Sequence, residues 1–180
     1  MASAALEKLR VAGFEEPEKV IDMYPFELSG GMAQRVTIAI SACSDADLII
    51  ADEPTNGLDS DGRRRFMDML GDVFPNAARI IITHDMGVAK MCDRILVLLS
   101  GCMMEKGSAL NVLGAPHHPY TRALIGSLVE NGMLETPKLR NRKGNCPFFT
   151  RCKYADAECN GDMKHREENG SEWWCCHDTS

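Results

Sequence analysis

Three polar residues directly follow two apolar runs, and they carry groups that could act on a phosphate chain. Asp52 and Glu53 come after the run Leu48–Ala51, and His84 follows a second run that ends at Thr83. A carboxylate such as Asp52 can hold magnesium, usually through water, and a neighbouring carboxylate such as Glu53 can polarise and orient an attacking water. The imidazole of His84 can donate a hydrogen bond to a γ-phosphate. These residue types therefore indicate phosphoryl transfer, which depends mainly on positioning and on charge stabilisation.

A third polar segment, Ser29-Gly30-Gly31, lies where a helix is expected to begin. Its hydroxyl and unobstructed backbone N–H groups would stand at the positive end of that helix, which favours anions. Glycine also allows a ligand to approach the backbone closely. Gln34 follows in the next turn, so the segment is a candidate phosphate-binding site.

Helices are expected around these groups. Apolar spacing and stop residues predict a helix that ends near Gly13, a short helix after Pro17, and a third helix capped by Ser29. A further helix is expected from Ser60 to Val73, where Arg63 and its two neighbours form a solvated face. The apolar face of the helix after Ser29 is expected to contain Met32, Val36, Ala39, Ile40 and Cys43.

Short apolar runs predict the strands that hold the acids and the histidine. Residues 48–51, 78–83 and 94–99 are expected to be strands, the first two buried on both faces, and Cys102–Glu105 the hairpin partner of the third. Asp85 is a plausible cap for a helix to Met91, and one or two helices should follow between 107 and 125. This alternation predicts parallel β-α-β units in a sheet covered on both faces.

Composition narrows the class of protein. The chain has 180 residues, 44% of them hydrophobic, and a formal net charge of -6, which disfavours a general binder of nucleic acid or anionic membranes. No apolar run approaches the roughly 18 to 20 residues that cross a bilayer, and residues 1–20 lack a signal-peptide core. We therefore expect a cytosolic protein.

Five of the eight cysteines gather in the last 35 residues. Clustered cysteines in a reducing compartment indicate metal more than disulfides. Cys146, Cys152, Cys159 and Cys176 supply four thiolates, enough for tetrahedral zinc or a cubane iron–sulfur cluster, and Cys175 is a spare candidate. The spacings alone leave the metal open.

The order of these motifs resembles that of ABC-type ATPases. Leu28-Ser29-Gly30-Gly31-Met32-Ala33-Gln34-Arg35 resembles their signature, Leu48 to Thr55 their Walker B segment, and Ile82-Thr83-His84-Asp85 their switch histidine. The resemblance implies an α/β fold: a partial ABC-type P-loop ATPase domain, with a parallel sheet core plus part of the helical subdomain, and a small cysteine-rich C-terminal region. No stretch reads G-x-x-x-x-G-K-S/T, so we expect the C-terminal portion of such a protein, without the Walker A region.

The resemblance also implies roles and partners. Glu53 and His84 would be catalytic, Asp52 would hold Mg2+, and the ATP-binding residues would be Ser29, Gly30, Gly31, Gln34 and Asp59. Family members pair their nucleotide-binding domains, each signature completing the partner's ATP site. The implied partners are a second nucleotide-binding domain in a homo- or heterodimer, membrane permease subunits and, indirectly, a solute-binding protein, without nucleic acid. The implied location is cytoplasmic, peripheral on the inner face of the cell membrane.

Pro116-His117-His118-Pro119-Tyr120-Thr121 predicts a rigid packed turn by its prolines. It also resembles the H-P-Y-T element of importers of oligopeptides, dipeptides and nickel. In that branch, similar C-terminal cysteines bind a four-iron four-sulfur cluster, so the resemblance favours this cluster over zinc at Cys146, Cys152, Cys159 and Cys176.

The expected organisation has three parts: residues 1–45 as part of the helical subdomain with the signature, 46–130 as the C-terminal part of the ATPase core with Walker B, D-loop and H-loop, and 131–180 as linker and cysteine-rich region. The leading hypothesis is a partial ATPase subunit of an importer. One alternative is a non-transport ABC ATPase that acts on DNA or ribosomes. Another is a catalytically silent fragment or metal-binding interaction module.

Overall fold

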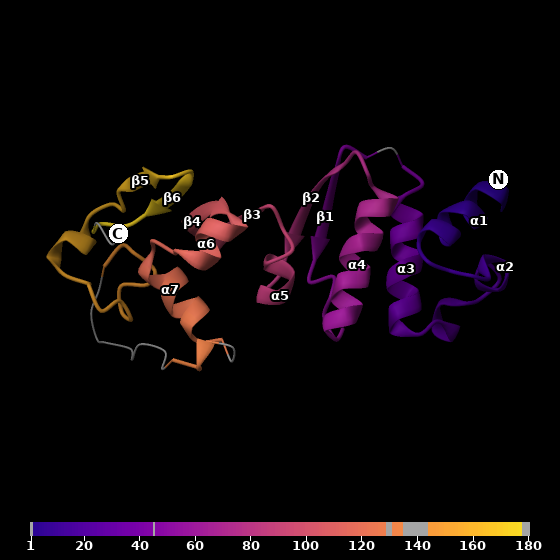
Figure 1. Ribbon diagram of the computed structural model, residues 1–180, viewed down its shortest axis with the longest axis horizontal. Coiled ribbons are helices and arrows are strands. Elements are labelled where there is room, and N and C mark those ends of the chain that lie inside the picture. The colour runs from indigo at the N-terminus through magenta and orange to yellow at the C-terminus, as the bar shows by residue number, and fades with distance from the viewer. Residues whose placement is uncertain (1, 45, 129–130, 135–143, 178–180) are drawn as a thin grey trace. The chain divides into compact units, whose positions relative to one another are not determined.

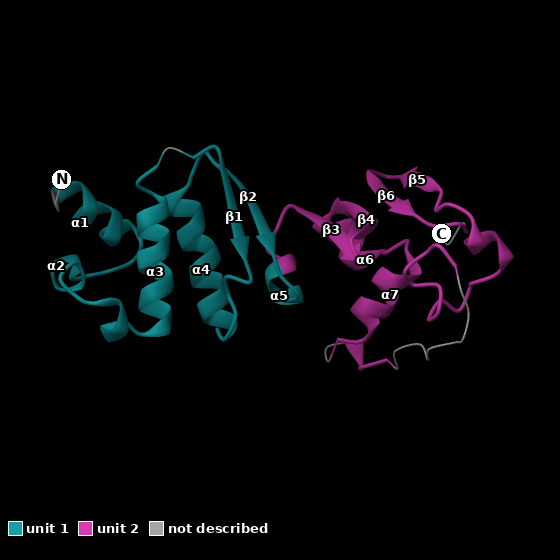
Figure 2. Cartoon of the chain, turned by 180° about the vertical axis from the view of Figure 1, so that it is seen from behind, with its two compact units in different colours: residues 1–88 teal, residues 89–180 magenta. Residues whose placement is uncertain are grey.

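The computed structural model describes residues 2–44, 46–128, 131–134 and 144–177. The chain divides into two compact units, Met1–Val88 and Ala89–Ser180 (Figure 2). Among the described residues, every helix is too short or too polar to cross a bilayer. Most of the expected linker, residues 135–143, lies outside the described part.

The first unit contains helices and a two-stranded parallel sheet (Figure 1). Its elements are α1 (Ala2–Val11), α2 (Pro17–Val20), the 3-10 turn η1 (Pro25–Glu27), α3 (Gly30–Ser41), β1 (Leu48–Asp52), α4 (Ser60–Val73), β2 (Ala78–Ile82) and α5 (Met86–Ala89), which ends in the second unit. The predicted helices are confirmed, although α5 ends at Ala89 and not at Met91.

Local chemistry explains where these helices begin and end. The Ser29 hydroxyl accepts a hydrogen bond from Met32 N at 3.3 Å and caps α3. The Asp59 carboxylate accepts one from Gly62 N at 2.7 Å and caps α4. These side chains satisfy backbone donors that the first turn of a helix leaves free. Gly13 follows α1 at φ +84°, a conformation that glycine adopts without steric cost.

Within the described part of the chain, the parallel sheet is covered on one face only. Ile49 and Ile81 pack with the buried residues of α3 and α4, which are Ile38, Ala42, Phe66, Leu70 and the following Phe74. On the opposite face, Ile50 is 62% exposed and its partner across the ladder, Ile80, is 49% exposed. The expectation of strands buried on both faces is therefore wrong. A continuous apolar run in a strand is compatible with burial on both faces of the sheet. It does not show that a layer of the protein covers the second face.

The buried face of α3 also differs in phase from the expectation. Ala39, Val36 and Met32 do pack with Leu9, Ala12 and Phe14. Ile40, however, is 68% exposed, and Cys43 is exposed. Both line an apolar groove with residues of α1 and α2, together with Met23, Pro25 and Leu28. The buried face of α3 instead includes Ile38 and the following Ala42, because α4 packs on that side.

The second unit contains an antiparallel sheet with strand order β3-β4-β6-β5. Its elements are β3 (Arg94–Leu99), β4 (Cys102–Ser108), α6 (Ala109–Gly114), α7 (Pro119–Gly126), the 3-10 turn η3 (Ala157–Asn160), β5 (His165–Glu168) and β6 (Ser171–Trp174). The β3–β4 hairpin is confirmed, with Ser100 and Gly101 at positive φ in its turn. The expectation that β3 continues the parallel sheet is wrong, because β3 pairs with β4, and β4 pairs in turn with β6.

The predicted turn before α7 is packed around a buried acid. Both oxygens of Glu105, which is 0% exposed, accept backbone hydrogen bonds, from His117 N at 2.8 Å and from His118 N at 2.9 Å. His118 Nδ1 accepts from Tyr120 N at 2.9 Å and caps α7. The His117 ring stacks on Trp173 of β6, with centroids 4.0 Å apart. This element therefore ties α7 to β4 and β6.

Candidate functional site

Glu53 directly follows β1, and the backbone bends away from the strand at this residue in an unusual conformation. Its N–H donates to Ile82 O at 2.8 Å, which extends the parallel ladder by one bond. Its φ is +46°, a left-handed conformation that costs a residue with a side chain free energy and that occurs often at functional sites. This bend brings the Glu53 carboxylate to the residues that follow β2.

Those residues are Thr83 and His84. His84 Nδ1 lies 2.7 Å from Glu53 Oε1, and His84 N donates to the same oxygen at 3.2 Å. The hydrogen bond with Glu53, followed by the charges of Glu53 and Asp85, raises the pKa of His84 above its ordinary value. Two of the predicted site residues are thus in direct contact, although 30 residues separate the segments that carry them.

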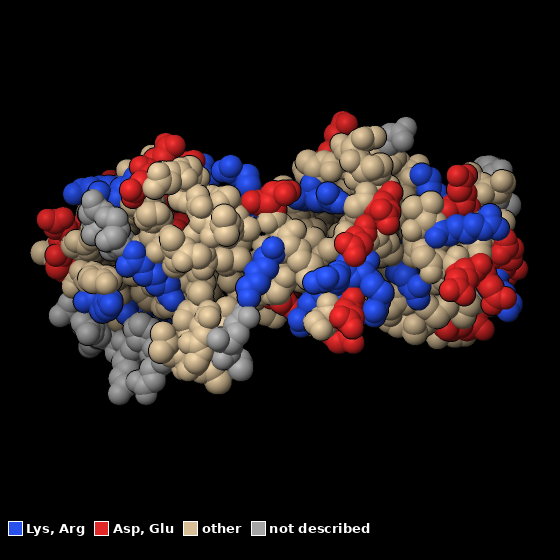
Figure 3. All heavy atoms as spheres, viewed as in Figure 1, with Lys and Arg blue, Asp and Glu red and all other residues tan. Residues whose placement is uncertain are grey.

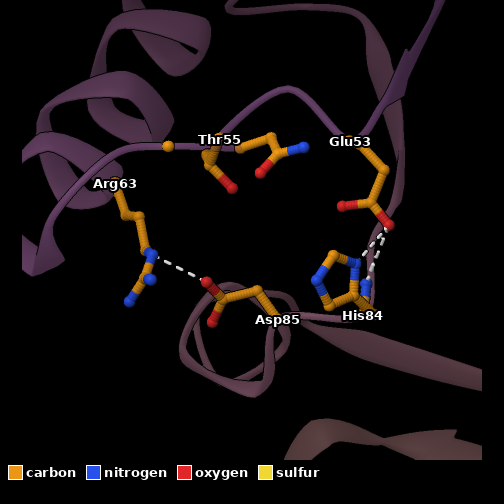
Figure 4. A pocket seen from close by; sticks show the side chains of 7 residues that line it. Glu53, Thr55, Arg63, His84 and Asp85 are labelled. Carbon is orange, nitrogen blue, oxygen red and sulfur yellow. Dashed lines mark hydrogen bonds and ion pairs between the residues drawn. The ribbon is translucent and has the colours of Figure 1, made fainter.

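A second ion pair closes the other side of the same pocket (Figure 4). Arg63 Nε, from the first turns of α4, lies 2.6 Å from Asp85 Oδ2, and Asp85 Oδ1 accepts from Gly87 N at 2.8 Å. The expectation that Arg63 lies on a solvated face is therefore wrong. The pocket is lined by Glu53, Thr55, Asn56, Gly57, Arg63, His84 and Asp85.

Sequence reasoning missed Arg63 and the partnership of Asp85. Opposite charges on two segments could pair in many ways, and the sequence gives no distance between α4 and the loop after β2. Asp59, which the resemblance assigns to ATP binding, caps α4 with its carboxylate at the end of the loop that forms one pocket wall.

Asp52 lies on the uncovered face of the sheet, beside Glu53 but outside the pocket lining. Its carboxylate takes part in none of the hydrogen bonds or ion pairs found among the described residues. A carboxylate at the carboxyl end of a parallel strand is a suitable oxygen ligand for hydrated Mg2+.

The signature residues lie at the start of α3 and do not line the pocket. Ser29, Gly30 and Gly31 are exposed, and Gln34 is half-buried. A Cβ atom at either glycine would meet no atom within 4 Å. Packing within this chain therefore does not require glycine there, which leaves room for another molecule to approach the backbone.

The cysteines of the second unit form a common buried group. Cys152, Cys159 and Cys176 pack with Phe148 and Phe149, and Cys146 packs against them. Burial is the main cause that raises the pKa of Cys146 to about 11, and the nearby thiols of Cys175, Cys152 and Cys159 contribute to this rise. Burial also raises the pKa of Cys176 to about 12, with Cys159 as the next cause. All eight cysteines are free thiols, so these side chains are available to a metal that displaces their protons.

Two protein families match the chain. The ABC transporter family matches residues 1–56, and the family described as the oligopeptide/dipeptide transporter C-terminal region matches residues 104–159. The first match contains the signature, Asp52 and Glu53, and the second contains the H-P-Y-T element and three of the clustered cysteines.

Individual relatives agree with these matches. The dipeptide transport ATP-binding protein DppD of Haemophilus influenzae is 38% identical over 184 residues, which covers 96% of this chain and 56% of that protein. The oligopeptide transport ATP-binding protein OppD of Salmonella typhimurium is 43% identical over 158 residues, 81% of this chain and 47% of that protein. The chain thus spans about half the length of these relatives.

A solved structure also matches. It is the dimeric, post-hydrolysis state of the ATP-binding cassette MJ0796 bound to ADP and Pi, with a TM-score of 0.52 and 32% identity. The match covers 59% of this chain and 46% of that chain.

Proposed function

Because the chain belongs to the family of ABC transporter ATP-binding proteins of peptide importers, we propose that it forms part of a subunit whose ATP hydrolysis drives import. Its fold is that of a partial ABC-type ATPase domain with an added cysteine-rich region, as predicted. The proposed solutes are oligopeptides, dipeptides or nickel. The observation that carries the proposal is the contact between Glu53 and His84 at the ends of β1 and β2.

In this proposal, Glu53 orients the attacking water and His84 contacts the γ-phosphate. Glu53 is well placed for a base because one oxygen is held by His84 and the carboxylate remains about one-third exposed (36%). Asp52 is the proposed Mg2+ residue, and the metal would supply charge neutralisation on the phosphates. The missing wall of this site is a P-loop from another polypeptide segment.

The signature acts on a different ATP molecule. Ser29, Gly30 and Gly31, followed by Gln34, would complete the site of a second nucleotide-binding domain, and Asp59 would shape the turn between the two sites. The open space beside both glycines supports this role, since a phosphate could reach the N-terminal backbone of α3 without steric conflict.

The remaining proposed partners are permease subunits and, through them, a solute-binding protein, at the inner face of the membrane. The apolar groove that contains Ile40 and Cys43 supports contact between the helical part and a permease. Basic and acidic side chains are interspersed on the face shown in Figure 3. This mixture and the net charge of -6 do not favour nucleic acid as a partner.

We also propose a four-iron four-sulfur cluster at Cys146, Cys152, Cys159 and Cys176. The donor set fits such a group, because several thiols share one apolar surrounding and perturb each other's pKa. A bound cluster would supply a cross-link between segments and one-electron chemistry. Cys175 also lies near these thiols, and its replacement tests the choice of Cys176.

The alternative is a catalytically silent fragment or a metal-binding interaction module. The buried cysteines favour the metal-binding module, since metal binding by these thiols does not require nucleotide. It predicts metal binding without any effect of the signature or of Glu53 on ATP turnover.

Complementation in trans tests the proposal. The full chain is added to an importer ATP-binding subunit that keeps its P-loop but carries a disabled signature. We expect the chain to restore ATPase activity, Ser29→Arg to abolish the effect, and Ser44→Arg, beyond the end of the same helix, to preserve it. The chain alone should bind ATP negligibly.

The proposal is refuted if the unmodified chain forms a demonstrated complex with the other protein but restores no ATPase activity. The catalytically silent module would then be the remaining function. Tight binding of ATP by a monodisperse monomer would also contradict it.

A further inference from the structure

Three side chains of different types converge near the thiol group of the second unit. His177 Nε2 lies 3.3 Å from Cys159 Sγ and 3.2 Å from Asp156 Oδ1. The donor atoms of Asp156, Cys159 and His177 all lie within 4.8 Å of one another. Neither Asp156 nor His177 belongs to the cysteine set that the sequence predicted.

The two separations from His177 are close to the edges of a tetrahedral zinc site. Zinc binds thiolate sulfur at about 2.3 Å and imidazole nitrogen or carboxylate oxygen at about 2.0–2.2 Å. Ligand atoms at tetrahedral angles are then about 3.4–3.6 Å apart, by the same bond lengths. The observed 3.2 and 3.3 Å would need to widen by only a few tenths of an ångström.

The backbone holds two of the donors in place. Asp156 is the cap of η3, where its Oδ1 accepts from Glu158 N at 2.9 Å, and Cys159 lies three residues later in the same turn. Asn145 N donates to Cys159 O at 3.1 Å, which fixes the turn from outside. His177 follows β6, whose end is held by the bond from Cys175 N to Lys164 O at 3.0 Å.

The site has a buried base and an open side. Cys159 is 5% exposed, whereas the Asp156 side chain is 55% exposed, so the group has an apolar base and an open side through which an ion can enter. Cys176 lies in the same buried cluster as Cys159, which makes it a further thiol near these three donors. Sulfur, nitrogen and oxygen donors together suit a borderline ion more than calcium or magnesium.

We propose that Asp156, Cys159 and His177 bind one zinc-class divalent ion, and that Cys176 moves in from the same cluster as the fourth donor. On binding, each coordinated thiol releases its proton to solvent. This mode shares Cys159 and Cys176 with the proposed iron–sulfur cluster, so the two occupants exclude each other. It does not use Cys146 or Cys152, and it does not depend on nucleotide.

The test is a titration of the full chain, purified free of metal under reducing conditions, with Co2+ and then with competing Zn2+. We expect sulfur-to-cobalt charge-transfer absorption and intense tetrahedral bands at one equivalent, both removed by Zn2+. His177→Gln and Asp156→Asn should weaken Zn2+ binding, His177→Gln by about 100-fold or more, since even an outer partner of a metal ligand contributes 10- to 100-fold.

Matched variants separate this proposal from the cluster. His165→Gln and Asp162→Asn, from the same unit, should leave Zn2+ affinity unchanged. Cys146→Ser and Cys152→Ser should also keep the cobalt spectrum but lose anaerobic reconstitution with iron and sulfide, which His177→Gln should retain. Tryptophan fluorescence of β6 verifies that each variant folds.

The proposal is overturned if the folded unmodified chain gives no tetrahedral cobalt spectrum, or if folded His177→Gln binds Zn2+ as tightly as the unmodified chain. It is also overturned if Cys146→Ser or Cys152→Ser removes Zn2+ binding as strongly as His177→Gln. Failure of iron reconstitution alone refutes only the cluster.

Discussion

The imidazole Nδ1 of His84 lies 2.7 Å from Oε1 of Glu53, although the two residues come from different strand ends. Parallel pairing of β1 with β2 puts both carboxyl ends at one edge of the sheet, and the bend at Glu53 turns its carboxylate toward His84. This relationship explains how two distant segments place their polar side chains at one edge of the sheet.

Replacement of Glu53 by Gln should lower the pKa of His84. The hydrogen bond with the Glu53 carboxylate is the largest cause of the raised pKa, and a neutral amide stabilises the imidazolium less. A histidine with a raised pKa favours the folded state fully below its unfolded pKa, and this contribution is lost as pH rises through the folded value. NMR titration of the His84 ring measures the change. Asp61→Asn is the control, and an unchanged pKa in Glu53→Gln would contradict the contact.

Replacement of Arg63 by Met should loosen the loop after β2. The ion pair with Asp85 is partly buried, so we expect a loss of about 1 kcal/mol or less in stability. The amide of Gly87, which Asp85 holds, should exchange hydrogen faster. Arg64→Met, at the exposed neighbour, is the matched variant and should leave Gly87 exchange unchanged.

Acid should destabilise the second unit through His118. Burial lowers its pKa to about 4, with the Arg122 charge as a second cause. A depressed histidine pKa means that the unfolded state binds more protons between about pH 6.5 and 4, so stability falls as pH falls through this window. The full effect is on the order of 3 kcal/mol. Urea unfolding followed by tryptophan fluorescence measures it, and His118→Asn, which keeps a capping acceptor, should flatten the pH dependence.

Truncation of Glu105 should destabilise the same unit more than a surface change. Glu105→Ala leaves the N–H groups of His117 and His118 without their acceptor in a buried turn. We expect a cost of about 2–4 kcal/mol in unfolding free energy. Glu168→Ala, at the exposed end of β5, should change stability by less than about 0.5 kcal/mol. Equal effects of the two substitutions would show that the carboxylate does not support the turn.

The uncovered face of the parallel sheet should promote association of the isolated chain. Exposed apolar strands attract each other and other apolar surfaces. We expect Ile50→Asp to reduce the apparent mass in light scattering, and Leu110→Asp, at an exposed apolar residue of the second unit, to have a smaller effect. A monodisperse unmodified chain would contradict this expectation.

Sequence reasoning was most successful where the signal is local. Ser29 as a cap, the helix from Ser60 to Val73 and the hairpin at Gly101 depend on neighbouring residues, and the structure has all three. The family assignment rests on motifs of this kind.

It failed where distant segments decide the outcome. The exposure of Ile50 depends on which layers cover the sheet, and the pairing of β3 depends on β4 and β6. The Arg63–Asp85 pair and the approach of His177 to Cys159 likewise require distances that residue spacing does not contain. The stacking of Trp173 on His117 likewise joins residues that are far apart in the sequence.

The left-handed backbone at Glu53 has a consequence for engineering. Glycine would adopt φ +46° with less strain but would lose the carboxylate, while most other residues would keep the strain and also lose the carboxylate. Selection for heat resistance alone is therefore expected to favour glycine at this position, so libraries screened for thermal tolerance should accumulate members that lack the proposed water-orienting carboxylate.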